Sequence, residues 1–212
     1  MFILSRRSIG AAGLTAVAVA AGAVATPAAS ARTVLSSGHV DAVAARIAGG
    51  RLVATLKDST KGATVWRDPA SVTIRVVPRA RTTIPGGSVL GRRGGTAWLI
   101  PQVQRSGIIW TGWNTEEVSS RQVRGPIRWT VRSISGPGRL VVFQTGTFGS
   151  ADVLFDSSRR MPQARAIALG THAHGNWAFT KRGTYRLAYT LSGRTPSGAT
   201  VSDSSTLTFS VG

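Results

Sequence analysis

Hydrophobic and polar residues alternate along much of the chain after residue 32, with the two-residue period of half-buried strands. The clearest example is segment 72–76, where Val72, Ile74 and Val76 alternate with Thr73 and Arg75. Glycine, proline, serine and threonine interrupt these segments at short intervals. The pattern predicts an all-β protein, with further strands at 97–100, 127–131, 140–144, 176–179, 185–190 and 207–211.

Turn residues indicate how these strands connect. Segments 39–47 and 51–58 flank a Gly-Gly pair, which is typical of a two-residue hairpin turn. We interpret residues 101–124 as a long inserted loop region and residues 159–168 as an exposed loop. A Gly-Thr-Tyr sequence that ends at Tyr185 is typical of the tyrosine corner of immunoglobulin-like domains. We therefore predict an immunoglobulin-like Greek-key β-sandwich with a long inserted loop region.

The first 31 residues have a different pattern. Arg6 and Arg7 precede an apolar stretch at 11–25, and the small residues at 29–31 suit a signal peptidase. We predict a signal peptide over residues 1–31, with a twin-arginine-like pair, and a single domain over residues 32–212. No later apolar run has membrane-spanning length, so we expect an extracytoplasmic protein without a transmembrane span after cleavage.

The absence of cysteine and the high positive charge limit the kinds of binding site that the chain can form. The chain has no cysteine, which excludes disulfides and thiolate metal ligands. Its formal net charge is +18, with 26 basic and 8 acidic residues. Such a charge favours contact with anionic wall polymers, but the arginines are scattered, so we predict no specific nucleic-acid site.

The three histidines lie in two short motifs. His39 precedes Asp41 by two residues, and His172 precedes His174 by two. Residues two apart in a strand face the same side, so four ligand-type groups would converge if the two strands paired. Imidazole and carboxylate suit a transition metal. The alternative is that the histidines only form hydrogen bonds that organise the fold.

A second group of residues predicts a ligand or partner surface. Trp110 and Trp113 could stack on sugar rings while Glu116 and Glu117 bond hydroxyl groups, although tryptophans also fill cores. We find no nucleophile motif or phosphate loop and predict no catalytic residues and no enzyme activity. A hydrolase in which a histidine–carboxylate cluster activates water is the least favoured alternative.

Several segments resemble one known family. The segment from Gly170, GTHAHGNWAFTKRGTYRLAYTLSG, and the upstream segments SSGHVDAVA and WRDPASV are similar to the actinobacterial surface-anchored protein domain family. These are wall repeat proteins associated with ABC transporters. The resemblance implies a cell-surface binding protein, zinc or manganese as the metal, and transporter components or other surface proteins as partners. The alternative is a structural wall module that binds anionic polymers or a protein partner.

Overall fold

The computed structural model describes residues 31–212, which form one compact unit. Within this range the protein is nearly all β, with sixteen strands and three 3-10 helices. The all-β prediction is therefore confirmed. No helix among residues 31–212 is long and apolar enough to cross a membrane. The predicted signal peptide lies outside the described residues, apart from its last position.

The larger sheet has six strands in the order β1-β5-β16-β15-β9-β12. Neighbours are antiparallel except at β1–β5 and β5–β16, which are parallel. On β9 the alternation is clear, because Ile127, Trp129 and Val131 are buried whereas Arg128 and Arg132 are exposed. The strands are β1 (Thr33–Leu35), β5 (Val72–Val76), β9 (Arg124–Ser135), β12 (Gln163–Ile167), β15 (Gly183–Arg194) and β16 (Thr200–Val211).

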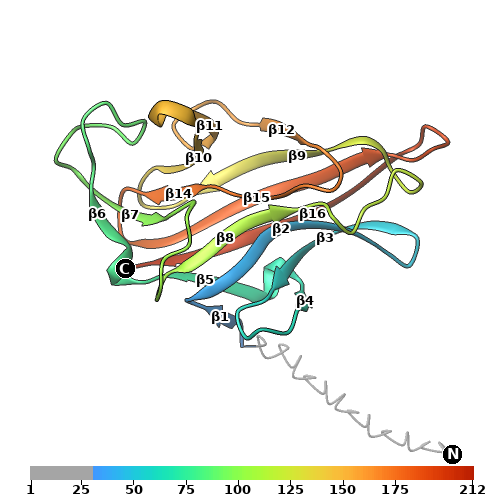
Figure 1. Ribbon diagram of the computed structural model, residues 1–212, viewed down its shortest axis with the longest axis horizontal. Helices are drawn as coiled ribbons and strands as arrows, with labels where there is room; N and C mark the ends of the chain where they lie inside the picture. The colour runs from blue at the N-terminus through green and yellow to red at the C-terminus, as the bar shows by residue number, and fades with distance from the viewer. Residues whose placement is uncertain (1–30) are drawn as a thin grey trace, which may run out of the picture. The chain divides into compact units, whose positions relative to one another are not determined.

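Two five-stranded sheets complete the fold (Figure 1), in the orders β13-β8-β2-β3-β4 and β11-β10-β14-β7-β6. Only Gly175 separates β13 from β14, so the chain passes directly from one sheet to the other. The first sheet has β2 (Gly38–Ala48), β3 (Arg51–Asp58), β4 (Val65–Arg67), β8 (Ile109–Asn114) and β13 (His172–His174). The second has β6 (Arg81–Thr83), β7 (Thr96–Ile100), β10 (Leu140–Thr145), β11 (Ala151–Asp156) and β14 (Asn176–Phe179). The 3-10 helices are η1 (Pro69–Ser71), η2 (Pro78–Ala80) and η3 (Thr147–Gly149).

An aromatic core holds the sheets together. Trp129 of the six-stranded sheet lies 5.9 Å from Trp113 on β8 and 6.2 Å from Trp177 on β14, measured between ring centroids. Trp129 and Trp177 are fully buried, as predicted. Burial of each large apolar side chain contributes about 1.5–3 kcal/mol. The main core is therefore shared by all three sheets, and a smaller apolar cluster includes Ala97, Val141 and Phe143.

Local turn chemistry follows the sequence prediction. The hairpin β2–β3 turns at Gly49 and Gly50, whose φ angles of 55° and 74° match a type I′ turn. The Tyr185 hydroxyl donates to the carbonyl of Lys181 at 2.9 Å, as in a tyrosine corner. The immunoglobulin-like Greek-key connectivity stays a prediction, because the strands form three sheets with parallel pairs.

Two loop predictions were wrong. The predicted excursion at 101–124 contains β8, which is an inner strand of its sheet, and the predicted exposed loop at 159–168 contains β12. The sequence does not reveal β8 because hydrophobic residues occupy both of its faces. It does not reveal β12 because this edge strand has a mostly polar or small-residue sequence, QARAI.

Candidate metal centre

The four predicted metal ligands lie on one face of the sheet β13-β8-β2-β3-β4. Their two strands do not pair with each other, because β8 lies between them. β2 runs parallel to β8 with Asp41 opposite Gly112, and β13 runs antiparallel to β8 with His174 opposite the same glycine. β8 therefore sets the register that brings Asp41 of β2 and His174 of β13 together.

Gly112 provides the space in which the ligands meet. A Cβ atom at this position would lie 2.6 Å from the Ala173 carbonyl oxygen, 2.8 Å from Asp41 Oδ1 and 2.8 Å from His174 Cε1. Real side chains do not tolerate such contacts, and the nearest of these atoms belongs to the backbone. Gly112 was not predicted as part of the site; the signal in the sequence is a glycine between Thr111 and Trp113, since a glycine inside a strand marks a close approach.

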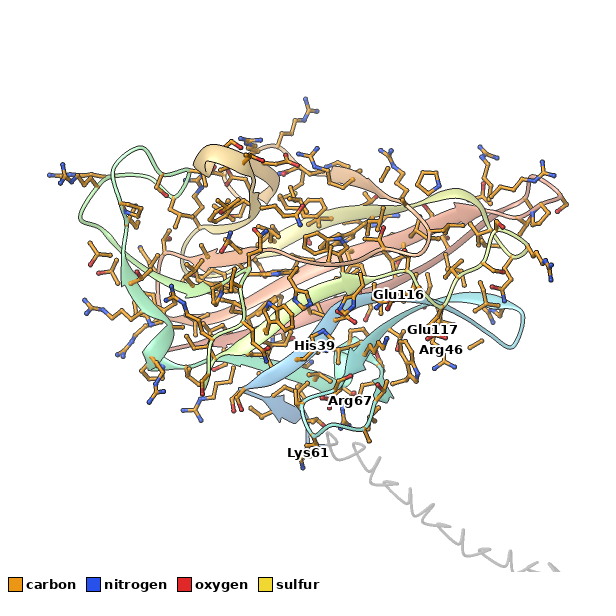
Figure 2. The ribbon with its side chains drawn as sticks, in the orientation of Figure 1. His39, Arg46, Lys61, Arg67, Glu116 and Glu117 are labelled. Carbon is orange, nitrogen blue, oxygen red and sulfur yellow. The ribbon has the colours of Figure 1, made fainter. Side chains whose placement is uncertain are left out.

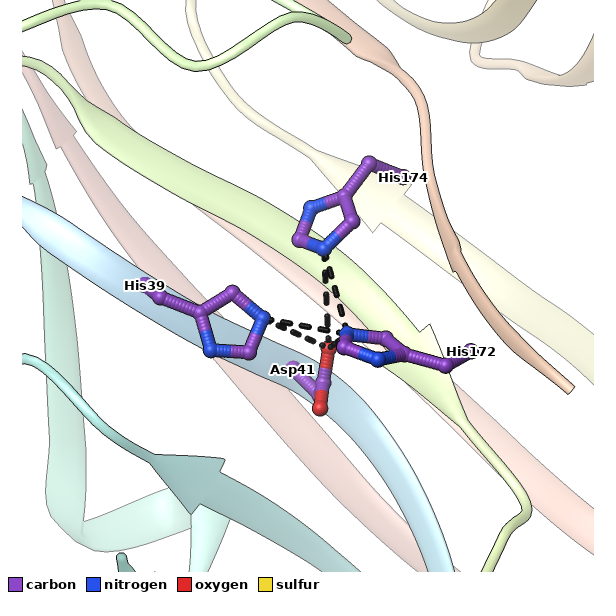
Figure 3. Close-up of side chains that lie close together, drawn as sticks. All are labelled: His39, Asp41, His172 and His174. Atoms are coloured by element: carbon purple, nitrogen blue, oxygen red, sulfur yellow. Dashed lines mark hydrogen bonds and ion pairs between the residues drawn. The ribbon is translucent and has the colours of Figure 1, made fainter. Parts of the chain in front are cut away.

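The ligand atoms converge on one point (Figure 3). The Nε2 atom of His172 lies 3.1 Å from that of His39 and 3.3 Å from that of His174. Asp41 Oδ1 is 3.1 Å from His172 Nε2, 3.4 Å from His39 Nε2 and 4.0 Å from His174 Nε2. All four potential ligand atoms lie within 4.8 Å of one another.

The four ligands differ in burial. Asp41 is fully buried, whereas the side chains of His174, His39 and His172 are 9%, 20% and 36% exposed. Asp41 Oδ1 has no hydrogen-bond partner, although imidazole nitrogens lie close to it. A buried carboxylate oxygen without a partner is costly. The imidazole nitrogens lie within hydrogen-bond distance of one another, but Asp41 Oδ1 accepts no hydrogen bond, and a cation at this point would satisfy the oxygen.

Electrostatics keep the cluster ready for a cation. Burial raises the pKa of Asp41, but interaction with the three imidazoles outweighs it, so the pKa lies below its ordinary value. Burial lowers the pKa of His174 to about 4. At neutral pH the site therefore presents a charged carboxylate and a neutral His174 imidazole, which are the protonation states that ligate metals.

A second set of polar groups supports the ligands. Asn114 donates from Nδ2 to Asp41 Oδ2 at 3.1 Å and to Glu116 Oε2 at 2.6 Å. Glu116 Oε2 also lies 3.9 Å from His172 Nδ1 and 3.6 Å from Lys57 Nζ. The hydrogen bond from Asn114, above all, lowers the pKa of Glu116. Such outer groups orient metal ligands in known sites.

The two tryptophans of the predicted sugar-binding or partner surface do not form one exposed surface. Trp113 is 5% exposed and packs on Trp129, so the prediction that it offers a ring to a ligand was wrong. Trp110 stacks on His174 with ring centroids 3.7 Å apart, and its Nε1 donates to the Gln102 carbonyl. Trp110 therefore forms a wall of the histidine cluster.

The two acidic residues of that predicted surface also differ from each other. Figure 2 shows Glu116 near the end of β8, with Glu117 further along toward Arg46. Glu116 contacts the cluster through Asn114, whereas Glu117 is exposed and makes no ion pair within residues 31–212. Only Glu116 belongs to the candidate metal centre.

The geometry suits a tetrahedral ion. Zinc binds histidine nitrogen at about 2.0–2.1 Å, so four tetrahedral ligands lie roughly 3.3 Å apart. Five of the separations between the ligand atoms fall between 3.1 and 4.0 Å. His39, Asp41, His172 and His174 could therefore hold one ion.

Comparison of the chain with protein-family models, characterised proteins and solved structures finds no match. The resemblance to the surface-anchored family consequently stays a prediction. What the molecule can do is inferred from the geometry of the cluster and from the charges around it.

Proposed function

We propose that this chain is a non-enzymatic extracytoplasmic protein that binds one zinc ion through His39, Asp41, His172 and His174. The observation that carries the proposal is the convergence of four ligand atoms within 4.8 Å around a buried carboxylate oxygen without a hydrogen-bond partner. Three imidazoles and one carboxylate form a ligand set typical of zinc.

The ligand set also bears on the choice of metal. Manganese prefers six ligands that are mostly oxygen, whereas this cluster offers three nitrogens and one oxygen. Copper binds nitrogen ligands more tightly than zinc in general, so it is the main competitor. Zinc is the better fit of the two metals that the family resemblance implies.

The number of protein ligands supports binding over catalysis. Catalytic zinc sites use three protein ligands and keep a fourth position for water, whereas closed sites have four. Here four side chains each offer one ligand atom, which would leave no tetrahedral position for water. This closed arrangement is the reason for proposing a binding protein over a hydrolase that activates water.

The proposed location and partners come from the sequence. The signal-like first 31 residues favour export, and the motifs around His39 and His172 resemble the surface-anchored family. We therefore include cell-surface location and contact with zinc-type transporter components in the proposal. In this setting the chain would hold or hand on the ion, and transport itself would belong to the partner.

Isothermal titration calorimetry of the purified protein with zinc tests the function. We expect one ion per chain and an affinity loss of at least about 100-fold in Asp41→Ala and His172→Ala. Asp152→Ala is the matched control, because Asp152 is 74% exposed and lies outside the cluster. Circular dichroism checks that each variant is folded.

Two results would overturn the proposal. If zinc, manganese, iron and copper all fail to bind stoichiometrically, the histidines only organise the fold. If wall substrates are turned over in a zinc-dependent way that His174→Ala abolishes, the protein is an enzyme.

A further inference from the structure

The outer face of the six-stranded sheet is a second surface with an unusual composition. Strand alternation turns one set of side chains of β9, β15 and β16 into the core and the other set away from it. The outward set consists mainly of arginine, serine and threonine. The exposed arginines on this face are Arg32, Arg75, Arg124, Arg128, Arg132, Arg186 and Arg194.

None of the chain's eight acidic residues points outward from this face. Among the strands β9, β15 and β16, the one acidic residue is Asp203 on β16. Its carboxylate turns inward and accepts a hydrogen bond from the Ala54 amide of β3 at 2.9 Å. The other acids lie on β2, β3 and β11 or in connecting segments. No arginine of this outer face forms an ion pair with a carboxylate among residues 31–212.

Neutral acceptors hold several of these guanidinium groups in place. Arg132 Nε donates to Thr190 Oγ1 at 2.8 Å, and Arg32 Nη1 donates to Thr208 Oγ1 at 2.7 Å. Arg194 Nη1 donates to the Gly198 carbonyl at 3.1 Å. Each of these hydrogen bonds uses one N–H group and leaves the positive charge and the remaining donors available. The arginines are thus positioned without being neutralised.

Three of the arginines line a groove of about 340 Å³ at one end of the sheet. Arg124 and Arg194 lie opposite each other on β9 and β15, and Arg128 lies opposite Ser192. Ser192 and Thr200 add hydroxyl groups to the lining, which also includes Pro126 and Gly193. Several guanidinium forks and hydroxyl groups around one hollow match the oxygen atoms of a phosphate group.

We infer that this face binds a linear phosphodiester polymer without aromatic groups, such as a poly(glycerol phosphate), with one phosphate seated in the groove. The outward face of β15 between Thr184 and Arg194 spans roughly 34 Å, which is long enough for several repeating units. The inference is independent of the proposed zinc site, because that site lies on a different sheet.

The composition of the face favours such a polymer over nucleic acid. The outward positions of β9, β15 and β16 carry no aromatic side chain on which a base could stack. The broad sheet also offers no helix or two-stranded ribbon to enter a DNA groove. The hydroxyl and guanidinium donors of this face can bind phosphate groups, but the face has no group that would bind a base.

Binding of poly(glycerol phosphate) to the intact protein, measured by biolayer interferometry at 50 and 200 mM NaCl, tests the inference. The groove variant Arg124→Ser/Arg128→Ser/Arg194→Ser should bind at least about 10-fold more weakly at 50 mM salt. The slope of log affinity against log salt should become less steep by roughly 0.7, because the variant no longer neutralises the one phosphate seated in the groove.

The control variant removes the same charge elsewhere. Arg92→Ser/Arg93→Ser/Arg105→Ser alters three exposed loop arginines and should change affinity by less than about 3-fold. Equal weakening in both variants would show attraction to net charge alone and overturn the inference. Tighter binding of single-stranded DNA than of poly(glycerol phosphate), or no polymer binding at 50 mM salt, would overturn it too.

Discussion

The outer faces of two sheets in this protein use polar residues in opposite ways. On the sheet β13-β8-β2-β3-β4, three histidines surround one buried carboxylate, and all ligand atoms lie within 4.8 Å. On the six-stranded sheet, seven exposed arginines are spread along the strands with no outward acid among them. A buried charge must be compensated where it lies, whereas an exposed charge is solvated and stays available to a partner.

The β10–β11 hairpin supplies the reference for this comparison. There Arg139 donates to Asp156 through Nε at 2.8 Å and Nη2 at 2.6 Å, and Asp156 is 2% exposed. This arginine has its own carboxylate and helps to hold the fold. The arginines on the outer face of the six-stranded sheet lack one, which leaves them free to bind an external anion.

Gly112→Ala should give the largest effect, because it closes the space on which the ligand cluster depends. The new methyl group would force β13 away from β8, since its nearest neighbour is the Ala173 carbonyl oxygen. We expect zinc affinity to fall by at least about 100-fold and stability to fall by about 1–3 kcal/mol. Calorimetry and urea unfolding measure the two losses, and polymer binding should stay unchanged.

Gly86→Ala is the matched control for that variant. A Cβ atom there would meet only the Arg93 side chain, at 3.5 Å, which is an ordinary contact. Unchanged zinc affinity in Gly112→Ala would mean that the ligands do not depend on this close approach.

Asp156→Asn tests whether the buried ion pair between Arg139 and Asp156 stabilises the fold. Although burial raises the pKa of Asp156, hydrogen bonds from Arg139 and Ser158 lower it from 3.8 to about 2. The folded-state pKa lies below the unfolded value, so the stabilisation is present above about pH 4 and is lost as the pH falls toward about 2. The shift corresponds to about 2 kcal/mol, or roughly 30-fold in the unfolding equilibrium.

Urea unfolding between pH 7 and pH 2 measures this contribution. The variant should be less stable at pH 7 and should lose the part of the pH dependence that comes from Asp156. Arg128→Ser, in contrast, should change stability by less than about 0.5 kcal/mol because Arg128 has no carboxylate partner among residues 31–212. A large loss of stability in Arg128→Ser would show that an arginine without a carboxylate partner stabilises the fold as Arg139 does.

Glu116→Gln should have the smallest effect. Its carboxylate lies 3.9 Å from His172 Nδ1 and can orient that imidazole toward the ion. We expect zinc affinity to fall roughly 10-fold, at the lower end of what outer groups contribute. Glu117→Gln, at the neighbouring exposed position, serves as control, and equal effects in the two variants would remove Glu116 from the site.

The sequence predicts the strands well where alternation is regular. On β9 and β15 one face is apolar and the other polar, so their position follows from local pattern alone. β8 breaks this pattern because both faces are covered, one by the core and the other by the histidine cluster. Its role as an inner strand therefore cannot be read from hydrophobic periodicity.

For the site, the sequence identified all four candidate ligands but not how they meet. Two residues of the same motif share a face because of strand geometry, which is local information. That β8 lies between the two motifs, and that Gly112 leaves room there, depends on pairing between distant segments. The same limit explains the error at Trp113, whose burial depends on packing against Trp129.

The distance along the chain between the ligands has a consequence for when the metal is acquired. His39 and His172 are separated by 133 positions, so no partial chain that ends before β13 contains a complete site. If the chain binds metal as proposed, loading follows the pairing of β2 and β13 with β8. A chain secreted unfolded would therefore take the ion available outside the cell, whereas one exported folded would carry the ion that it met in the cytoplasm. The metal found in the isolated protein would record the compartment in which it folded.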